Sequence, residues 1–194
     1  PIEWEVKPIC NIAPLQRGFD LPINNISNGI YPVVFSNGIL KYHNSWRVKG
    51  PGVVTGRSGT IGKLFYLEED FWPHNTTLWV TNFKGNNPKF VYYLFNRLSL
   101  GLLATGSGVP TLNRNDIHDL KIAIPNLIRE QTAIATALSD TDALIAALDK
   151  KIAKKQQIKQ GAMKQLLTGK KRLPRFVLEN KYKETEIGQI PEDW

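Results

Sequence analysis

Three clusters of polar side chains, interleaved with basic and aromatic residues, lie within 41–49, 57–63 and 107–114. Arginine, lysine, asparagine and threonine side chains read base edges, and they also bind phosphates. Ordinary loop polarity explains any single one of them equally well, so only the clusters as a group predict DNA contact. The candidate DNA-binding residues are Lys41, Asn44, Arg47, Lys49, Arg57, Ser58, Thr60, Lys63, Ser107, Thr111, Asn113 and Arg114.

The patterns that would indicate an enzyme are incomplete. The segment from Gly56 to Lys63 resembles a phosphate-binding loop, but its spacing is one residue too long and Leu64 replaces the magnesium-binding Ser or Thr. Lys89 replaces the second proline of the Asn-Pro-Pro-aromatic loop found in amino-methyltransferases. The three histidines, His43, His74 and His118, lack metal-ligand spacing. We therefore expect no catalytic residues, no metal site and no cofactor.

The net charge of +8 is unevenly distributed along the chain. Residues 1–125 carry a net +4, residues 126–149 a net −3 and residues 179–194 a net −3, whereas residues 150–178 carry ten basic residues and no acidic one. Such a run suits contact with a polyanion, although a solvated helix face explains any single lysine as well.

Composition indicates one domain with an extension. The apolar content is 42%, enough for a hydrophobic core, and no run approaches the ~20 apolar residues of a membrane span. The sequence has one cysteine, Cys10, and lacks a signal-peptide pattern, which fits a cytoplasmic setting. Because no initiator methionine precedes Pro1, we expect a processed chain or a fragment.

Short apolar runs separated by turn residues predict an α+β domain over residues 1–125. Asn37-Gly38 is a hairpin signal, and Asn87-Pro88 predicts a helix with Asn87 as N-cap. The glycines of 56–62 permit tight turns. The expected strands cover residues 30–35, 52–54, 63–67, 77–83 and 120–124.

Residues 126–169 predict one long helix, with Asn126 as N-cap and Gly169 as its stop. At about 1.5 Å per residue it would be roughly 60 Å long, which is more than one small domain can cover. An amphipathic helix packed on its own domain is the alternative. A heptad seam instead predicts pairing with another helix, through Ile134, Leu138, Thr141, Ile145, Leu148 and Ile152.

Taken in order, several segments are similar to the specificity subunit of type I restriction–modification systems. They are residues 53–63, residues 107–113, residues 120–125 running into Glu130-Gln131, and the Leu166-Leu167-Thr168-Gly169 helix end. The resemblance implies a non-catalytic subunit whose recognition domain reads half of a split double-stranded DNA target. It also implies a helix that spaces two recognition domains, and docking of the modification and restriction subunits.

The chain departs from that family in holding one recognition domain and one long helix where the family's usual subunit holds two of each. Residues 170–194 form a basic-to-acidic tail, and its end resembles the opening of a second recognition domain. We therefore expect a half-subunit, natural or truncated, that forms a homodimer through its helix. The alternatives are a helical interaction scaffold that binds no DNA and, third, a nuclease or methyltransferase fragment.

Overall fold

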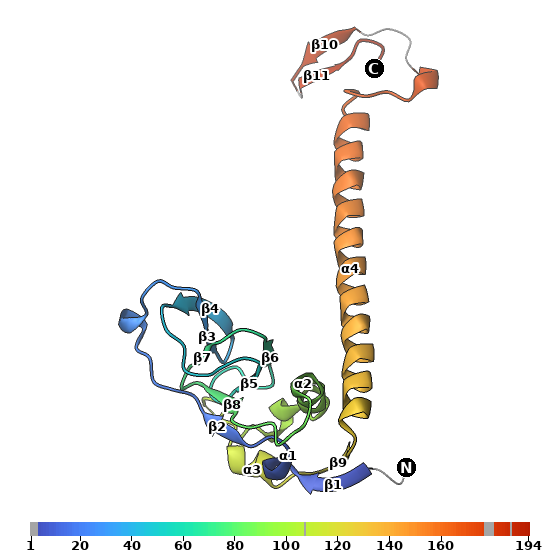
Figure 1. The fold of residues 1–194 in the computed structure, drawn as a ribbon. Helices are drawn as coiled ribbons and strands as arrows, with labels where there is room; N and C mark the ends of the chain where they lie inside the picture. Colours follow the sequence, from blue (N-terminus) through green and yellow to red (C-terminus); the bar gives the residue numbers. More distant parts are fainter. Residues whose placement is uncertain (1–3, 107, 177–180, 187) are drawn as a thin grey trace. The chain divides into compact units, whose positions relative to one another are not determined.

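The structure, a computed structural model, describes residues 4–106, 108–176, 181–186 and 188–194 (Figure 1). The chain divides into two compact units, Pro1–Leu138 and Ser139–Trp194. The long helix α4 (Ile128–Leu166) contributes its first turns to one unit and the remainder to the other. Within the described residues, no helix combines the length and apolar character that crossing a membrane requires.

The first unit is an α+β domain built on three small sheets. The four-stranded sheet has the order β2-β8-β5-β6, the three-stranded sheet β4-β3-β7, and β1 pairs with β9. The strands are β1 (Trp4–Pro8), β2 (Leu15–Arg17), β3 (Tyr31–Phe35), β4 (Gly38–His43), β5 (Gly52–Gly56), β6 (Leu64–Leu67), β7 (Trp72–Pro73), β8 (Thr77–Val80) and β9 (Lys121–Pro125). The short helices are α1 (Ile9–Ile12), η1 (Ile23–Asn25), η2 (Leu100–Leu103) and α3 (Arg114–His118).

The strongest local signals gave the correct elements. Strands β3 and β4 form the hairpin expected at Asn37-Gly38, with Phe35 opposite Gly38. The Asn87 side chain caps α2 (Pro88–Arg97) by accepting a hydrogen bond from the Phe90 N–H at 3.0 Å. The strand expected at 77–83 ends earlier, at Val80. The Thr81 N–H still bonds to the Pro14 carbonyl, but Pro14 has no N–H with which to continue the pairing.

The main hydrophobic core forms where α2 packs on the four-stranded sheet. Phe90, Val91, Leu94 and Phe95 are the buried residues of α2. They join buried side chains of α1, α3, β5, β8 and β9 in one cluster, which Ala135 of α4 also enters. The first turns of the long helix therefore belong to the core of the first unit.

Gln131 attaches the start of α4 to this unit. Its side chain is only 2% exposed. The Gln131 Oε1 accepts a hydrogen bond from the Asn87 N–H at 2.9 Å. The Gln131 Nε2 donates to Asn86 Oδ1 and to the Pro125 carbonyl oxygen, both at 2.8 Å. A buried amide is costly unless it is hydrogen-bonded, so this site holds the helix, α2 and the end of β9 in one arrangement.

The expected N-cap at Asn126 was wrong. Helix α4 begins at Ile128, and the N–H groups of Glu130 and Gln131 bond to the Leu127 carbonyl. Pro125 is still part of β9, so the chain needs two more residues to turn into the helix. The expected stop is confirmed, because Gly169 adopts a positive φ of 69° after the last helical turn.

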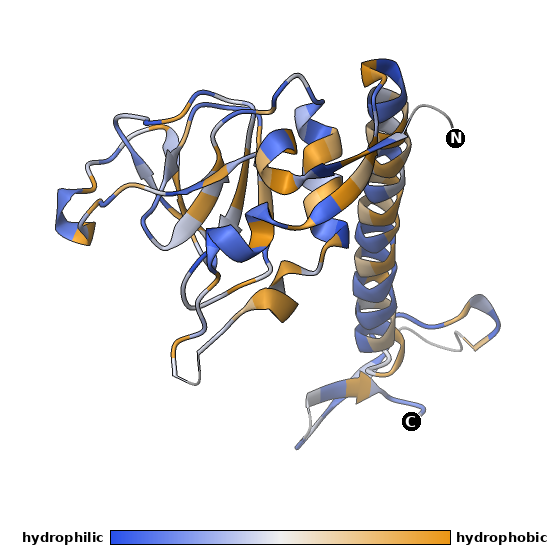
Figure 2. Ribbon diagram, turned by 90° about the horizontal axis from the view of Figure 1, so that it is seen from below, coloured by the Kyte–Doolittle hydropathy of each residue, from blue (hydrophilic) through white to orange (hydrophobic). Residues whose placement is uncertain are grey.

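The second unit contains the rest of α4, η3 (Pro174–Phe176) and a hairpin of β10 (Tyr182–Thr185) and β11 (Gly188–Pro191). Arg172 pairs with Asp193, and the Tyr182 hydroxyl donates to the Gly169 carbonyl at 3.1 Å. The tail therefore folds against the end of the helix. Hydrophobic and hydrophilic residues both recur along the length of α4 (Figure 2).

Candidate nucleic-acid interface

The fold brings the second and third polar clusters together. The Leu112 N–H donates to the Arg57 carbonyl at 2.8 Å, and the Gly59 N–H donates to the Pro110 carbonyl at 3.1 Å. Ser58 and Thr111 form an antiparallel bridge. The loop between β5 and β6 thus lies beside residues 110–112, although the two are far apart in sequence. Ser107 lies outside the described residues.

Glycines shape the β5–β6 loop, which carries Arg57, Ser58, Thr60 and, at its end, Lys63. Gly59 and Gly62 have φ values of +84° and +88°, a region that side-chain-bearing residues rarely enter. A Cβ on Gly56 would lie 1.9 Å from the Thr60 carbonyl oxygen. The glycines predicted to permit tight turns do so here.

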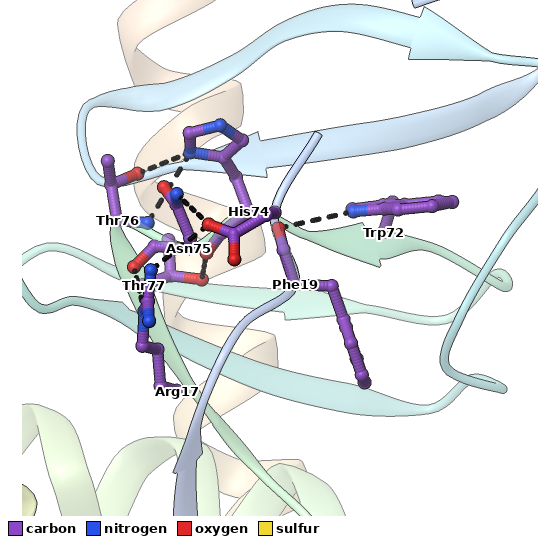
Figure 3. A network of polar contacts seen from close by, with 8 residues as sticks. Arg17, Phe19, Trp72, His74, Asn75, Thr76 and Thr77 are labelled. Carbon is purple, nitrogen blue, oxygen red and sulfur yellow. Dashed lines mark hydrogen bonds and ion pairs between the residues drawn. The ribbon is translucent and has the colours of Figure 1, made fainter. Parts of the chain in front are cut away.

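A third segment, the turn between β7 and β8, joins these loops, and no sequence signal indicated it. The Thr76 carbonyl accepts hydrogen bonds from the N–H groups of Arg57 and Ser58, at 2.8 and 3.1 Å. The Thr76 hydroxyl lies 3.0 Å from His74 Nδ1 and accepts from the Ser36 N–H at 3.3 Å. Figure 3 shows His74, Asn75, Thr76 and Thr77 grouped beside Arg17. Hydrogen bonds therefore fix this turn against the start of the β5–β6 loop.

A pocket of about 420 Å³ opens where these segments meet β2. Four of the predicted DNA-binding residues line it, together with Arg17, which sequence reasoning did not identify. The Arg17 Nε donates to the Asn75 carbonyl at 3.4 Å, and its guanidinium pairs with Asp20 at 3.0 Å. The lining consists of Arg17, Arg57, Leu78, Thr111, Leu112, Asn113 and Arg114.

The sequence suggested that Asn113 and Arg114 lie in a loop. In the structure they lie at the start of a helix. The Asn113 side chain caps α3 by accepting a hydrogen bond from the Asn115 N–H at 3.1 Å. Arg114 is the first residue of α3, and its side chain is exposed. An Asn side chain that bonds to a nearby backbone N–H can start either a helix or a turn. At Asn113 it starts a helix, in which Ile117 is buried.

The first cluster contributes no residue to the lining of this pocket. Val48 bridges to Phe71 at the start of β7, whereas the Arg57 end of the domain meets Thr76, beyond the end of β7. Arg47 lies over the rings of Trp72 and Phe19, at 4.8 and 5.9 Å, so it packs on aromatic side chains. Asn44 and Lys49 are exposed near that end, and Lys41 is exposed on β4.

Lys63 and Thr60 complete the loop. The Lys63 Nζ approaches the Asn37 carbonyl at 3.5 Å, which places the β3–β4 turn beside the β5–β6 loop. Thr60 is half-buried behind Gly56. Among the residues that the structure describes, no group of three His, Cys, Asp or Glu side chains could hold a metal ion. The chemistry available here is hydrogen bonding and positive charge.

The protonation state of His118, next to this site, should make the stability of the domain depend on pH. Its Nε2 accepts a hydrogen bond from the Leu15 N–H at 2.9 Å, which requires the unprotonated ring nitrogen. Burial lowers the pKa of His118 below the usual 6.5, and the charge of Arg114 lowers it further. Burial also lowers the pKa of His74. Both histidines are therefore neutral in the folded protein at pH values where the unfolded chain begins to take up protons.

We expect the free energy of unfolding to keep its histidine contribution above pH 6.5 and to decrease as the pH drops below that value. In that range the unfolded state binds protons that the folded state excludes. Urea unfolding at neutral and mildly acidic pH measures the loss. His118→Gln retains an acceptor for Leu15 without titrating, so it should reduce the pH dependence and leave the share due to His74. An unchanged pH dependence in that variant would contradict the assignment.

Comparisons with known proteins point in one direction. A family model for the type I restriction modification DNA specificity domain matches residues 1–160. The chain is 41% identical over 90 residues to the type I restriction enzyme MjaVIII specificity subunit of Methanocaldococcus jannaschii, over 46% of this chain and 20% of that protein. This chain therefore spans about a fifth of that relative's length.

Two solved structures share the fold. The S subunit of the type I restriction–modification system from M. genitalium gives a TM-score of 0.65 at 18% identity, covering 84% of this chain and 45% of that one. A chain from a structure concerned with complex assembly and conformational transition of the type I R-M system gives 0.68 at 13% identity, covering 85% and 46%. The mixed α+β domain with its long helix is thus the architecture of those subunits, and this chain spans less than half of each.

Proposed function

Because the chain belongs to the family of type I restriction modification DNA specificity domains, we propose that it is the sequence-recognition component of such a system. One observation carries the proposal beyond family membership: two polar loops, far apart in sequence, lie side by side and are held by backbone hydrogen bonds. Loops fixed on a rigid scaffold are well suited to reading a surface as regular as duplex DNA. The domain would read one half of a bipartite target.

The proposed role is recognition without catalysis, in the cytoplasm, where the target DNA would lie. Methyl transfer and cleavage would be supplied by separate modification and restriction subunits, which this chain would position on the DNA. The solved relative whose structure concerns complex assembly of the type I R-M system supports such partners. The basic run from Lys150 onward is available either for DNA phosphates or for docking those subunits.

Helix α4 supports a homodimer. Leu138, Ile145, Leu148 and Ile152 of the seam are all exposed large hydrophobic residues, and Ile134 is partly buried against the core. Residues 126–149 carry a net −3, whereas the helix from Lys150 to Lys164 carries only positive charge. Two copies that pair antiparallel bring the acidic half of each against the basic half of the other. Parallel pairing would instead oppose like charges.

The dimer predicts the symmetry of its target. Identical domains related by a two-fold axis read the same short word on opposite strands, so the target should be an interrupted palindrome. Half-sites read on one face of the duplex would lie roughly 34 Å apart, about one helical turn. Selection from a randomised duplex pool with the modification subunit present, followed by sequencing, should recover such a site. Deleting one heptad within 141–148 should shorten the gap or abolish binding.

Recovery of an asymmetric split site would refute the symmetric dimer while leaving DNA recognition intact. Failure to retain any duplex, at low salt as well as high, would refute DNA recognition. It would favour the scaffold role, in which the exposed seam docks a protein partner. The two parts of the proposal therefore fail in different ways.

A further inference from the structure

Resting on the proposed function, we propose that the pocket lined by Arg17, Arg57 and Arg114 binds a backbone phosphate of the DNA and does not read a base. This pocket, named here the arginine pocket, has the seven lining residues given above. Its assignment gives Arg17 a function that sequence reasoning did not suggest. It also assigns Arg57 and Arg114 to phosphate binding, where the sequence left both phosphate binding and base reading open.

Three separate elements supply the arginines. Arg17 is the last residue of β2, Arg57 follows β5 directly and Arg114 begins α3. Backbone contacts hold the three elements: the Leu112 N–H bonds to the Arg57 carbonyl, and the Gly18 N–H bonds to the Thr77 carbonyl at 3.0 Å. Convergence of three cations from three rigid elements costs electrostatic free energy in the unliganded protein. An anion in the pocket offsets that cost.

The positive charge is only slightly neutralised by the protein. Within the described residues, no Asp or Glu side chain lines the pocket. Asp20 pairs with Arg17, but that pair is exposed on both sides and is therefore weak. Arg114 lowers the pKa of His118, which means that its charge is felt locally. The pocket lining therefore carries net positive charge, which an anion can neutralise.

The concave shape selects phosphate over base. Base edges are recessed in the grooves, so a side chain must project outward to reach them. The arginine pocket does the opposite: buried Leu78 and Leu112 form part of its lining, and the arginines come from the surrounding elements. A phosphodiester projects from the duplex and can enter a pocket, with its deoxyribose against apolar side chains. Guanidinium groups match phosphate oxygens in geometry and charge.

The test measures affinity for a target duplex and a scrambled duplex by fluorescence anisotropy over a range of KCl concentrations, with the full chain. Arg114→Ala should weaken binding to both duplexes by the same factor, about tenfold for each chain that carries the substitution. The slope of log affinity against log salt should become less steep by about 0.9 for each phosphate contact removed. Arg17→Ala should behave alike.

Matched variants separate the pocket from general charge and from folding. Lys121→Ala removes one exposed positive charge on β9, away from the pocket lining, and should change affinity and slope little. Arg114→Lys keeps the charge and should keep the salt slope while losing part of the affinity. Thermal unfolding of each variant confirms that the domain is intact. A duplex with one neutral methylphosphonate at the contacted position should bind the wild type less well, yet bind Arg114→Ala as the unmodified duplex does.

A loss confined to the target duplex would overturn the proposal, because it would assign the arginines to base reading. Losses no larger than that of Lys121→Ala would also overturn it, with DNA recognition unaffected. Competition by inorganic phosphate in place of duplex binding would assign the pocket to a free anion and overturn the DNA assignment. If the wild type retains no duplex, the proposed function fails first, and this inference fails with it.

Discussion

Replacing Ile145 and Leu148 together by lysine is expected to convert the proposed dimer into monomers or insoluble protein. These side chains are 52% and 49% exposed in a single chain, although both are large and apolar. In a paired seam each would be worth about 1.5–3 kcal/mol when fully buried, and a dimer contains two copies of each. Four lysines at the centre of the seam would remove that burial and add repulsion. Sedimentation at micromolar concentration measures the result.

The matched control introduces the same charges on the outer face of the helix. Ala143→Lys with Ala147→Lys places two lysines in the same heptads but off the seam, so the control should remain a dimer. A wild-type chain that sediments as a monomer at micromolar concentration would exclude the dimer. Equal effects of both double variants would show that charge on the helix, and not the seam, governs association.

Gln131→Leu is expected to destabilise the first unit by about 3 kcal/mol. The change keeps the volume of the side chain but removes three hydrogen bonds of 2.8–2.9 Å. The Asn87 N–H, the Pro125 carbonyl and Asn86 Oδ1 would then be left without this partner. Asn86 has little freedom to rotate, because its Nδ2 already donates to the carbonyls of Phe83 and Ile12.

Urea unfolding at fixed protein concentration measures the effect, because the proposed dimerisation would make apparent stability depend on concentration. Gln157→Leu makes the same chemical change at an exposed position of the same helix and should alter stability by no more than about 0.5 kcal/mol. Gln131→Glu is a second probe, because it keeps an acceptor for Asn87 and loses both donated bonds. An unfolding midpoint for Gln131→Leu equal to that of Gln157→Leu would refute the role given to this residue.

The fold could be predicted best where the signal lies within a few neighbouring residues. Asn87 before Pro88 satisfies a helix start without help from the rest of the chain, and it was correct. Asn37-Gly38 specifies a tight turn through backbone conformation alone. By contrast, β1 and β2 were missed, because each becomes a strand only through partners distant in sequence, β9 and β8. In addition, β2 has three residues, which are too few to show an alternating pattern of their own.

The candidate site divides in the same way. Residue type marked Arg57, Thr111, Asn113 and Arg114 as polar or basic groups suited to DNA, and the structure places all four around one pocket. Residue type could not separate them from Arg47, which packs on Trp72 and does not line the pocket. Nor could it indicate Arg17 or the turn at Thr76. Their importance comes from position, and neither has a neighbouring motif.

The sequence by itself determined that this chain has an α+β domain followed by a long helix with an apolar seam, and it indicated the family. These properties depend on periodicity, charge runs and local turn chemistry, all of which are written along the chain. Only the tertiary structure decided which polar residues share a site and how Gln131 secures the helix. Such contacts join segments that are far apart in sequence, and their geometry follows from core packing, which no local pattern encodes.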